Sequence, residues 1–353
     1  MTTRLKRLSE QVMVITGATS GIGLTTARKA AARGAKLVLA ARDEAALRRL
    51  EEEFRRQGFE ALGVPTDVGD RHAMEGLAQV ALARFGRIDT WVNNAGVSIF
   101  GTNEEVAMED HERLFQTNFW GVVYGSLEAV KHMRKDGGAL INLGSELSDV
   151  SVPLQGMYAA SKHAVKGFTD SLRMELEKEG APVSVTLIKP AAIDTMFTVH
   201  AKNYMAREPK LPPPVYAPDL AADAILRAAE HPERDLFVGG AAKLTSFTGL
   251  NLPRLLDKYM EALMFKLQRS ELPSATNRRD ALHQADPSQE LRERLGSEHA
   301  VHESCAYTRF SLRSHKPLTL ALLGGGALLA AWQLAKHSQP AAAALPAPAP
   351  STH

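Results

Sequence analysis

An apolar run that passes directly into a glycine-rich turn decides the fold class: VMVITGATSGIG, residues 12–23. The first five residues are typical of a buried strand, and the glycines follow where this strand turns into a helix. Glycines let the backbone approach a pyrophosphate closely, and a helix N-terminus offers unpaired N–H groups to its negative charge. An ordinary glycine-rich turn is the alternative. The placement between strand and helix favours a dinucleotide site built from Gly17, Thr19, Ser20, Gly21, Ile22 and Gly23.

Short β-branched runs alternate with helical periodicity through the first two-thirds of the chain. Strands are predicted at residues 12–16, 36–40, 61–64, 90–92, 139–143, 183–188 and 236–238. Helical spacing of apolar residues covers 114–133 and 163–176. Such alternation implies βαβ crossovers and a parallel sheet covered on both faces. The predicted fold class is therefore α/β, a Rossmann-like doubly wound parallel sheet with helices on both faces.

Charge and cysteine content exclude several kinds of partner. The chain has 353 residues, 42 of them basic and 40 acidic, and a net charge of +2. Its first 270 residues show no basic stripe, so nucleic acid is not a predicted partner. The single cysteine, Cys305, allows no intramolecular disulfide, which suits a reducing compartment. His299 and His302 precede it closely, but a fourth ligand at suitable spacing is missing, so we predict a solvated segment and no metal site.

The last quarter of the chain changes character. We predict one large α/β domain over 1–270, a polar linker over 271–316 with at most one short helix near 289–295, an apolar helix over 317–337, and a disordered Pro/Ala-rich tail over 338–353. The uncharged run 318–335 is just long enough to cross a bilayer. Basic residues before it would keep the large domain cytoplasmic if the run were a membrane anchor. A helix docked on a partner and an ordinary buried helix are the alternatives.

A methionine-rich apolar stretch precedes the three prolines at 212–214. Its large side chains are Met196, Phe197, Val199, Tyr204 and Met205. The stretch is too long for a simple strand-to-helix connection, which favours a mobile lid. The same side chains could line an apolar substrate pocket or pack as core, and the sequence does not choose between these.

The end of the second strand indicates which dinucleotide is bound. A dinucleotide fold often places an acid there for the adenosine ribose, but this chain has Ala41 followed by Arg42. A guanidinium can bind a 2′-phosphate with paired hydrogen bonds, whereas an acid would repel it. We therefore favour NADP(H) over NAD(H). Asp43 is close enough to leave NAD(H) open, and Arg42 could also be a solvated strand-end residue.

Tyr158 and Lys162 are four residues apart on a predicted helix, so their side chains share a face. An unperturbed phenol has a pKa of about 10 and is a poor base at neutral pH. A nearby ammonium and a cationic nicotinamide would favour the phenolate. By itself the pair also fits two solvent-facing residues on a helix, so further motifs must support the catalytic interpretation.

Those motifs are present, and with them the chain resembles the short-chain dehydrogenase/reductase family, in the branch with a TGxxxGxG loop. The motifs are the loop at 16–23, Asp67-Val68, Asn93-Asn94-Ala95-Gly96, Asn118, Ser145, and Tyr158 with Lys162. Their order and spacing are jointly very specific, and the resemblance covers residues 8–270. It implies an oxidoreductase that transfers a hydride between a nicotinamide cofactor and a carbonyl or alcohol.

The resemblance also implies a role for each motif residue. Tyr158 would be the general acid and base, and Ser145 would hold the substrate oxygen. Lys162 would lower the pKa of Tyr158 and bind the nicotinamide ribose, and Asn118 would hold a water that connects Lys162 to solvent. The other implied cofactor contacts are Asp67, Val68, Asn94, Ala95, Gly96, Pro190, Ile193 and Thr195, together with the glycine loop.

One position departs from the family pattern. The family usually has Pro-Gly after its sixth strand, but here Ala191 follows Pro190, although Ile193 and Thr195 still match. A positive φ at Ala191 would be strained by its methyl group.

The leading hypothesis is an NADP(H)-dependent enzyme that acts on an apolar ketone, aldehyde or secondary alcohol. The alternative from another class is a membrane-associated dinucleotide sensor or scaffold without turnover, which the set Asn118, Ser145, Tyr158 and Lys162 disfavours. A sugar-nucleotide epimerase or dehydratase is disfavoured by the glycine spacing. The resemblance implies a homodimer or homotetramer formed through the helices that carry Asn118 and Tyr158.

Overall fold

The computed structural model describes residues 4–296 and 300–313. Its central sheet consists of β1 (Val12–Thr16), β2 (Lys36–Ala41), β3 (Ala61–Pro65), β4 (Thr90–Asn93), β6 (Gly138–Leu143), β7 (Val183–Pro190) and β11 (Asp235–Val238). All seven strands are parallel, in the order β11-β7-β6-β4-β1-β2-β3. In register, Val14 of β1 lies between Val38 and Trp91. The predicted doubly wound parallel sheet is confirmed.

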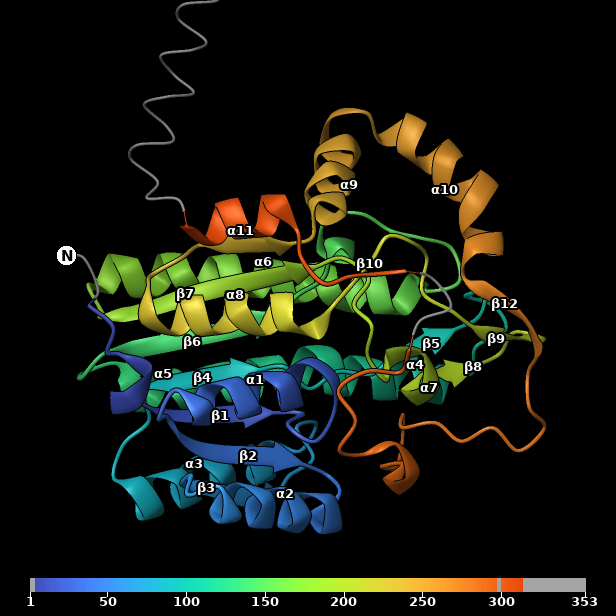
Figure 1. Ribbon diagram of the computed structural model, residues 1–353. Helices are drawn as coiled ribbons and strands as arrows, with labels where there is room; N and C mark the ends of the chain where they lie inside the picture. The colour runs from blue at the N-terminus through green and yellow to red at the C-terminus, as the bar shows by residue number, and fades with distance from the viewer. Residues whose placement is uncertain (1–3, 297–299, 314–353) are drawn as a thin grey trace, which may run out of the picture. The chain divides into compact units, whose positions relative to one another are not determined.

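Helices cover both faces of this sheet (Figure 1). The long helices of the two faces are α1 (Gly21–Ala32), α2 (Glu44–Arg56), α3 (Arg71–Phe85), α5 (Gly121–Met133), α6 (Gly156–Glu179) and α8 (Pro218–Glu230). The core lies between sheet and helices, where Val14, Trp91 and Leu140 pack with Met74 and Val130. Because the strands are buried on both sides, β1 and β2 are nearly continuous apolar runs, whereas β7 also buries Ser184 and Thr186.

The loops at the carboxyl ends of the strands carry smaller elements. These are β5 (Ile99–Phe100), α4 (Met108–Phe115), α7 (Phe197–His200), β8 (Lys202–Asn203), β9 (Arg207–Pro209), β10 (Val215–Tyr216), α9 (Gly240–Asn251), α10 (Pro253–Leu267), β12 (Arg269–Pro273), β13 (Val301–His302) and α11 (Ala306–Arg313). Three short pairs link them: β5 with β8, β9 with β12, and β10 with β13. Residues far apart in the sequence therefore meet at this end of the sheet.

The predicted polar linker is wrong for the part of 271–316 that the structure describes. The described residues up to 311 form one compact unit, and Leu282, Asp286 and Thr308 are buried within it. Leu282 packs in an apolar cluster with Val97 and Leu114. The rest of the segment is held by backbone hydrogen bonds and arginine side chains, such as the donation from Arg113 to the Leu282 carbonyl oxygen at 3.2 Å. Such contacts leave no apolar periodicity in the sequence, which is why composition suggested a linker. The large domain therefore extends past residue 270.

Two predictions concern residues beyond this description. Among residues 4–296 and 300–313, no helix is long and apolar enough to cross a bilayer, and the predicted helix at 317–337 lies outside these ranges, as does the tail at 338–353. The same described residues contain no cluster of three histidine, cysteine or acidic side chains that could hold a metal, and His299 lies outside them.

Candidate active site

The glycine loop between β1 and α1 has a backbone course that side chains would block. Gly17 has a φ of 64°, and a Cβ at Gly23 would lie 2.0 Å from the Gly17 carbonyl oxygen. The Asn94 amide donates to the carbonyl oxygens of Thr16 at 2.9 Å and Gly17 at 3.1 Å, which holds the loop against the end of β4. The N-cap residue Ser20 makes no side-chain hydrogen bond to the first turn of α1. The Ser20 side chain thus leaves the amides of this helix N-terminus to other partners, as a pyrophosphate site requires, although the Gly21 amide already donates to the Arg292 carbonyl oxygen.

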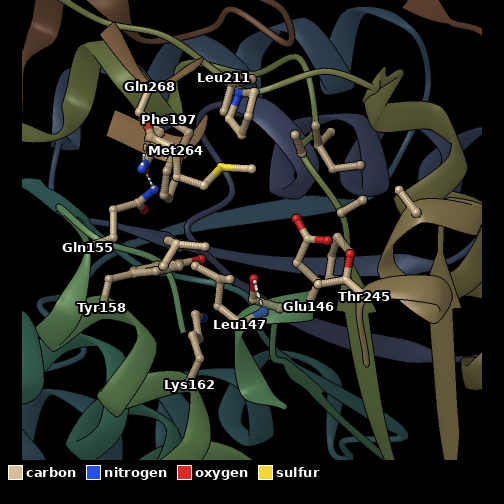
Figure 2. A pocket seen from close by; sticks show the side chains of 18 of the residues that line it. Glu146, Leu147, Gln155, Tyr158, Lys162, Phe197, Leu211, Thr245, Met264 and Gln268 are labelled. Carbon is tan, nitrogen blue, oxygen red and sulfur yellow. Dashed lines mark hydrogen bonds between the residues drawn. The ribbon is translucent and has the colours of Figure 1, made fainter. Parts of the chain in front are cut away.

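A cavity of about 660 Å³ opens beside this loop at the carboxyl ends of the central strands (Figure 2). Dinucleotide-dependent α/β proteins bind their ligands at this edge of the sheet. The predicted site residues that line it are Ile22, Asn94, Gly96, Ser145, Tyr158, Lys162, Pro190, Ile193 and Thr195. The predicted residues that do not line it are Gly17, Thr19, Ser20, Gly21, Gly23, Arg42, Asp67, Val68, Ala95 and Asn118. The cavity thus brings together the residues implied to serve catalysis and the nicotinamide half of a cofactor.

Tyr158, Lys162 and Ser145 form one group in this cavity. The first two lie one turn apart on α6, with the Lys162 Nζ 5.6 Å from the centroid of the Tyr158 ring. That Nζ donates to the Leu143 carbonyl oxygen at 2.8 Å. Ser145 follows the end of β6, accepts a hydrogen bond from the Leu147 amide at 3.1 Å, and hydrogen-bonds the Tyr158 phenol. A phenol, a hydroxyl and an ammonium are therefore collected around one point.

Burial controls the protonation of this group. It raises the pKa of Tyr158 well above its ordinary value; the hydrogen bond with Ser145 opposes the rise, and the charge of Glu146 adds to it. Burial also lowers the pKa of Lys162 to about 8. Lys162 was predicted to lower the pKa of Tyr158. The pKa is raised instead, because desolvation of the phenolate is the larger effect. At neutral pH the phenol is protonated and Lys162 is mostly charged.

The amide oxygen and nitrogen of the Asn118 side chain both have hydrogen-bond partners within the protein. It lies in a π-helical turn between α4 and α5, and its Oδ1 accepts from the Val97 amide at 2.8 Å. Its Nδ2 donates to the Val97 carbonyl oxygen at 2.9 Å and to the Ser161 hydroxyl at 3.2 Å. Since Ser161 precedes Lys162 on α6, these hydrogen bonds hold α6 against the loop that follows β4. The water-holding role of Asn118 stays a prediction.

Glu146 is a residue of the cavity that the sequence analysis missed. It follows Ser145 directly and lines the cavity, and Figure 2 shows it on the side away from Gln155 and Gln268. Burial raises its pKa to about 7. The only signal in the sequence was its place next to Ser145, which does not distinguish a cavity carboxyl from an exposed one.

Replacing Glu146 with glutamine is expected to change how stability depends on pH. Because the folded pKa of about 7 exceeds the ordinary value of 4.5, the native state holds this proton more tightly than the unfolded state. The contribution to stability is full below the unfolded value and is lost as pH rises through 7. Glu146→Gln should therefore gain stability relative to the parent by about 1–3 kcal/mol between about pH 5 and pH 8.

Denaturant unfolding of both proteins at these two pH values measures the difference. The matched control is Glu104→Gln at an exposed position, which should show the same stability difference from the parent at both pH values. A Glu146→Gln difference that does not change with pH would show that the carboxyl is not held protonated.

The predicted lid divides into two kinds of residue. Met196 and Met205 are buried core residues, and the Tyr204 hydroxyl donates to Asp110 at 2.7 Å. Phe197 lines the cavity, with its ring 5.3 Å from that of Tyr158 at 70°. The pocket interpretation therefore holds for Phe197, and the core interpretation holds for the methionines.

Two glutamines that the sequence analysis missed connect the catalytic helix to the C-terminal part of the domain. The Gln155 amide donates to the Gln268 Oε1 at 2.6 Å, and the Gln268 amide donates to the Pro153 carbonyl oxygen at 2.9 Å. Both glutamines line the cavity above Tyr158 in Figure 2. Because the two glutamines are 113 residues apart, no local sequence pattern predicted this pairing.

Residues 281–292 lie against the part of the site that was predicted to hold adenosine. The Gly21 amide donates to the Arg292 carbonyl oxygen at 2.9 Å, and the Leu291 amide donates to the Thr19 carbonyl oxygen at 2.8 Å. Arg42 donates to the carbonyl oxygens of Ala281 and Leu282.

Nearby, Asp67 forms an ion pair with Arg113 at 2.6 Å, and Val68 is buried. Thr19, Gly21 and Arg42, which were predicted to bind the cofactor, therefore hydrogen-bond this segment.

The Ala191 position carries no backbone strain. Among the described residues, the non-glycine residues with positive φ are Leu154 and Leu291, so Ala191 has an ordinary backbone conformation. The expected strain of a methyl group there is therefore not present, and Pro190, Ala191 and Ile193 all reach the cavity.

A glycine-rich loop between a strand and a helix, beside a half-buried tyrosine and a buried lysine and serine, defines the class: a dinucleotide-dependent oxidoreductase. Residues 11–205 match the family model for short chain dehydrogenases. The chain belongs to the short-chain dehydrogenase/reductase family and is an NAD(P)-dependent oxidoreductase.

Individual relatives agree with this assignment. The oxidoreductase YxnA of Bacillus subtilis is 46% identical over 337 residues, covering 95% of this chain and 93% of its own. An 11-beta-hydroxysteroid dehydrogenase of Sesamum indicum is 33% identical over 259 residues, covering 70% and 73%. A gluconate 5-dehydrogenase of Burkholderia cenocepacia, solved with NADP and tartrate, is 26% identical with a TM-score of 0.59, covering 67% of this chain and 97% of its own.

Proposed function

We propose that this chain transfers a hydride between NADP(H) and an apolar carbonyl compound or secondary alcohol, with Tyr158 as general acid and base. The observation that carries the proposal is the grouping of Tyr158, Ser145 and Lys162 in a cavity that Ile22 of the glycine loop also lines. A substrate panel of ketones, aldehydes and secondary alcohols, tested with NADPH, NADH and their oxidised forms, examines the cofactor, direction and substrate class together.

Each side chain has a defined task in carbonyl reduction. The protonated Tyr158 phenol donates its proton to the carbonyl oxygen, and the Ser145 hydroxyl donates a hydrogen bond to the same oxygen. Lys162 is positively charged at neutral pH and stabilises the phenolate that remains. A nicotinamide cofactor, when bound beside Ile22 and Thr195, would supply the hydride or accept it in alcohol oxidation. Asn118 supports this group through its hydrogen bonds to Val97 and to Ser161, which precedes Lys162 on α6.

The cavity lining supports an apolar substrate. Its side chains beyond the reacting group are largely hydrophobic: Leu147, Val152, Phe197, Leu211, Leu244, Leu255, Leu256, Tyr259, Met260 and Met264. Pockets of this size and composition bind small apolar molecules oriented by a few polar groups.

Replacing Arg42 with alanine is expected to weaken NADPH binding by about 10–100-fold, because a charge-assisted contact to the 2′-phosphate is lost. Binding of NADH should change much less. Fluorescence titration with both cofactors gives the ratio of dissociation constants. Equal weakening of the two would mean that Arg42 serves only to hold residues 281–292 and that the NADP preference is wrong.

The alternative function is a membrane-associated dinucleotide sensor without turnover. The observation in its favour is the packing of residues 281–292 on Thr19, Gly21 and Arg42, because a segment that shares atoms with a cofactor site can respond to binding. Turnover of any panel member by the parent, absent in Tyr158→Phe, excludes it. A cytoplasmic location, anchoring through 318–335 and a homodimer or homotetramer stay proposals.

A further inference from the structure

Helices α9 and α10 project beyond the sheet (Figure 1). They expose a set of large apolar side chains. Leu244, Leu250 and Leu255 are 65%, 73% and 64% exposed. The other members of this set, each at least 40% exposed, are Phe247, Leu252, Tyr259, Leu263 and Phe265. We call these eight side chains the α9–α10 patch. Isolated exposed hydrophobic residues are ordinary, but a contiguous group of this kind marks an interaction surface.

Helix α10 has one wide apolar face made of two adjacent rows of side chains. One row carries Met260 and Met264, which are buried, and Leu256, which packs on the core near Leu147. The next row carries Leu255, Tyr259 and Leu263 at helical spacing, all exposed. The fold therefore covers only part of this apolar face, and the exposed row is accessible to a partner.

The patch is continuous with the active-site cavity. Leu244, Leu255 and Tyr259 belong to the patch and also line the cavity that contains Tyr158. An apolar partner on this surface would therefore meet the mouth of the cavity. A partner that dissolves apolar molecules would place substrate at that mouth without passage through water.

We propose that the α9–α10 patch docks onto the surface of a phospholipid bilayer and that the cavity takes its apolar substrate from the membrane. Docking itself does not depend on catalysis, whereas substrate uptake from the bilayer rests on the proposed function. An amphipathic surface of this kind lies in the interface and does not cross the membrane.

Charge and sequence favour lipid over a second copy of the chain. Residues 240–267 contain four basic side chains, Lys243, Arg254, Lys258 and Lys266, against two acidic ones, Asp257 and Glu261, a balance that suits anionic headgroups. A further uncharged apolar run occurs in the sequence at 318–335, outside the described residues. Stable peripheral anchoring takes two such signals, and this chain contains two.

A single fluorophore can report whether the patch enters lipid. Cys305 is the chain's one cysteine, so a Cys305→Ser background of the full chain accepts one new thiol. Leu250→Cys labels the patch, and Val80→Cys on α3 labels an exposed apolar residue outside it as matched control. Both are labelled with an environment-sensitive dye and mixed with phosphatidylcholine vesicles containing one-fifth phosphatidylserine.

We expect a blue shift with a several-fold rise in emission for the label at Leu250 when vesicles are added, and quenching of that emission by spin-labelled lipids. The label at Val80 should not respond. Vesicle-bound protein whose Leu250 label stays in water would overturn docking, as would a failure of the chain to bind vesicles. A blue shift that grows with protein concentration without vesicles would assign the patch to a second copy and overturn the lipid proposal.

Uptake from the bilayer is tested separately from turnover. With an apolar ketone dissolved in the vesicles, the double variant Leu250→Glu, Phe247→Glu should lose at least several-fold in rate relative to the parent, while both reduce a water-soluble ketone. Equal rates from vesicles would overturn uptake alone. Absence of turnover of either ketone by the parent would overturn the proposed function and, with it, uptake, while the fluorescence result on docking would still stand.

Discussion

The Tyr158→Phe variant is expected to lose about 10³–10⁴-fold in kcat/KM, because proton transfer by a positioned acid contributes up to about 10⁴-fold. The substitution removes one oxygen and leaves the ring that packs edge-on against Phe197. Fold and cofactor binding should therefore persist. Steady-state rates with the best ketone of the panel, together with a cofactor titration, measure both quantities.

Tyr124→Phe is the matched control for this loss. Tyr124 lies on α5, where its ring stacks on Trp120, and it does not line the cavity. This variant should keep the parental rate. If Tyr158→Phe kept more than a tenth of the parental kcat/KM, another group would have to supply the proton, and Glu146 would be the first candidate because its pKa is raised to about 7.

The sequence predicted the sheet and the grouping of Tyr158 with Lys162 because each had a local signal. Strands buried on both faces are rich in apolar residues, so β1 and β2 could be recognised from their residues alone. Tyr158 and Lys162 are separated by one helical turn, which the fold preserves on α6. Spacing along the chain was enough to predict their shared face.

Other features left no local signal. The packing of residues 281–292 depends on backbone donors and acceptors, which every residue has, so nothing in the composition of the segment predicted it. The pKa of Tyr158 depends on how deeply the fold buries the phenol, and the nearby lysine gave the wrong direction for the shift. Glu146 required knowledge of the loop after β6 to be placed in the cavity. Burial and long-range contact decide all three.

The Gly23→Ala variant is expected to lose about 3 kcal/mol of stability, since forcing a methyl group into a packed site costs about 1–3 kcal/mol or more. The added Cβ would lie 2.0 Å from the Gly17 carbonyl oxygen and 2.6 Å from the Asn94 Nδ2. The first of these atoms is backbone, so the loop itself must move. Thermal and denaturant unfolding measure the loss, and a cofactor titration should show binding weakened beyond detection.

Gly167→Ala on α6 separates this clash from a general effect of adding a methyl group. No atom lies within 4 Å of a Cβ at Gly167, and the position is exposed. Alanine should therefore raise stability there by about 0.5–1 kcal/mol through its helix propensity. A loss of stability in Gly23→Ala together with a gain in Gly167→Ala would show that the close contacts at position 23, and not the added methyl group in general, cause the loss. A Gly23→Ala protein with the parental stability and cofactor affinity would contradict this prediction. It would mean that the loop can move away from Asn94 to make room for the methyl group, and that the cofactor site does not depend on this close approach.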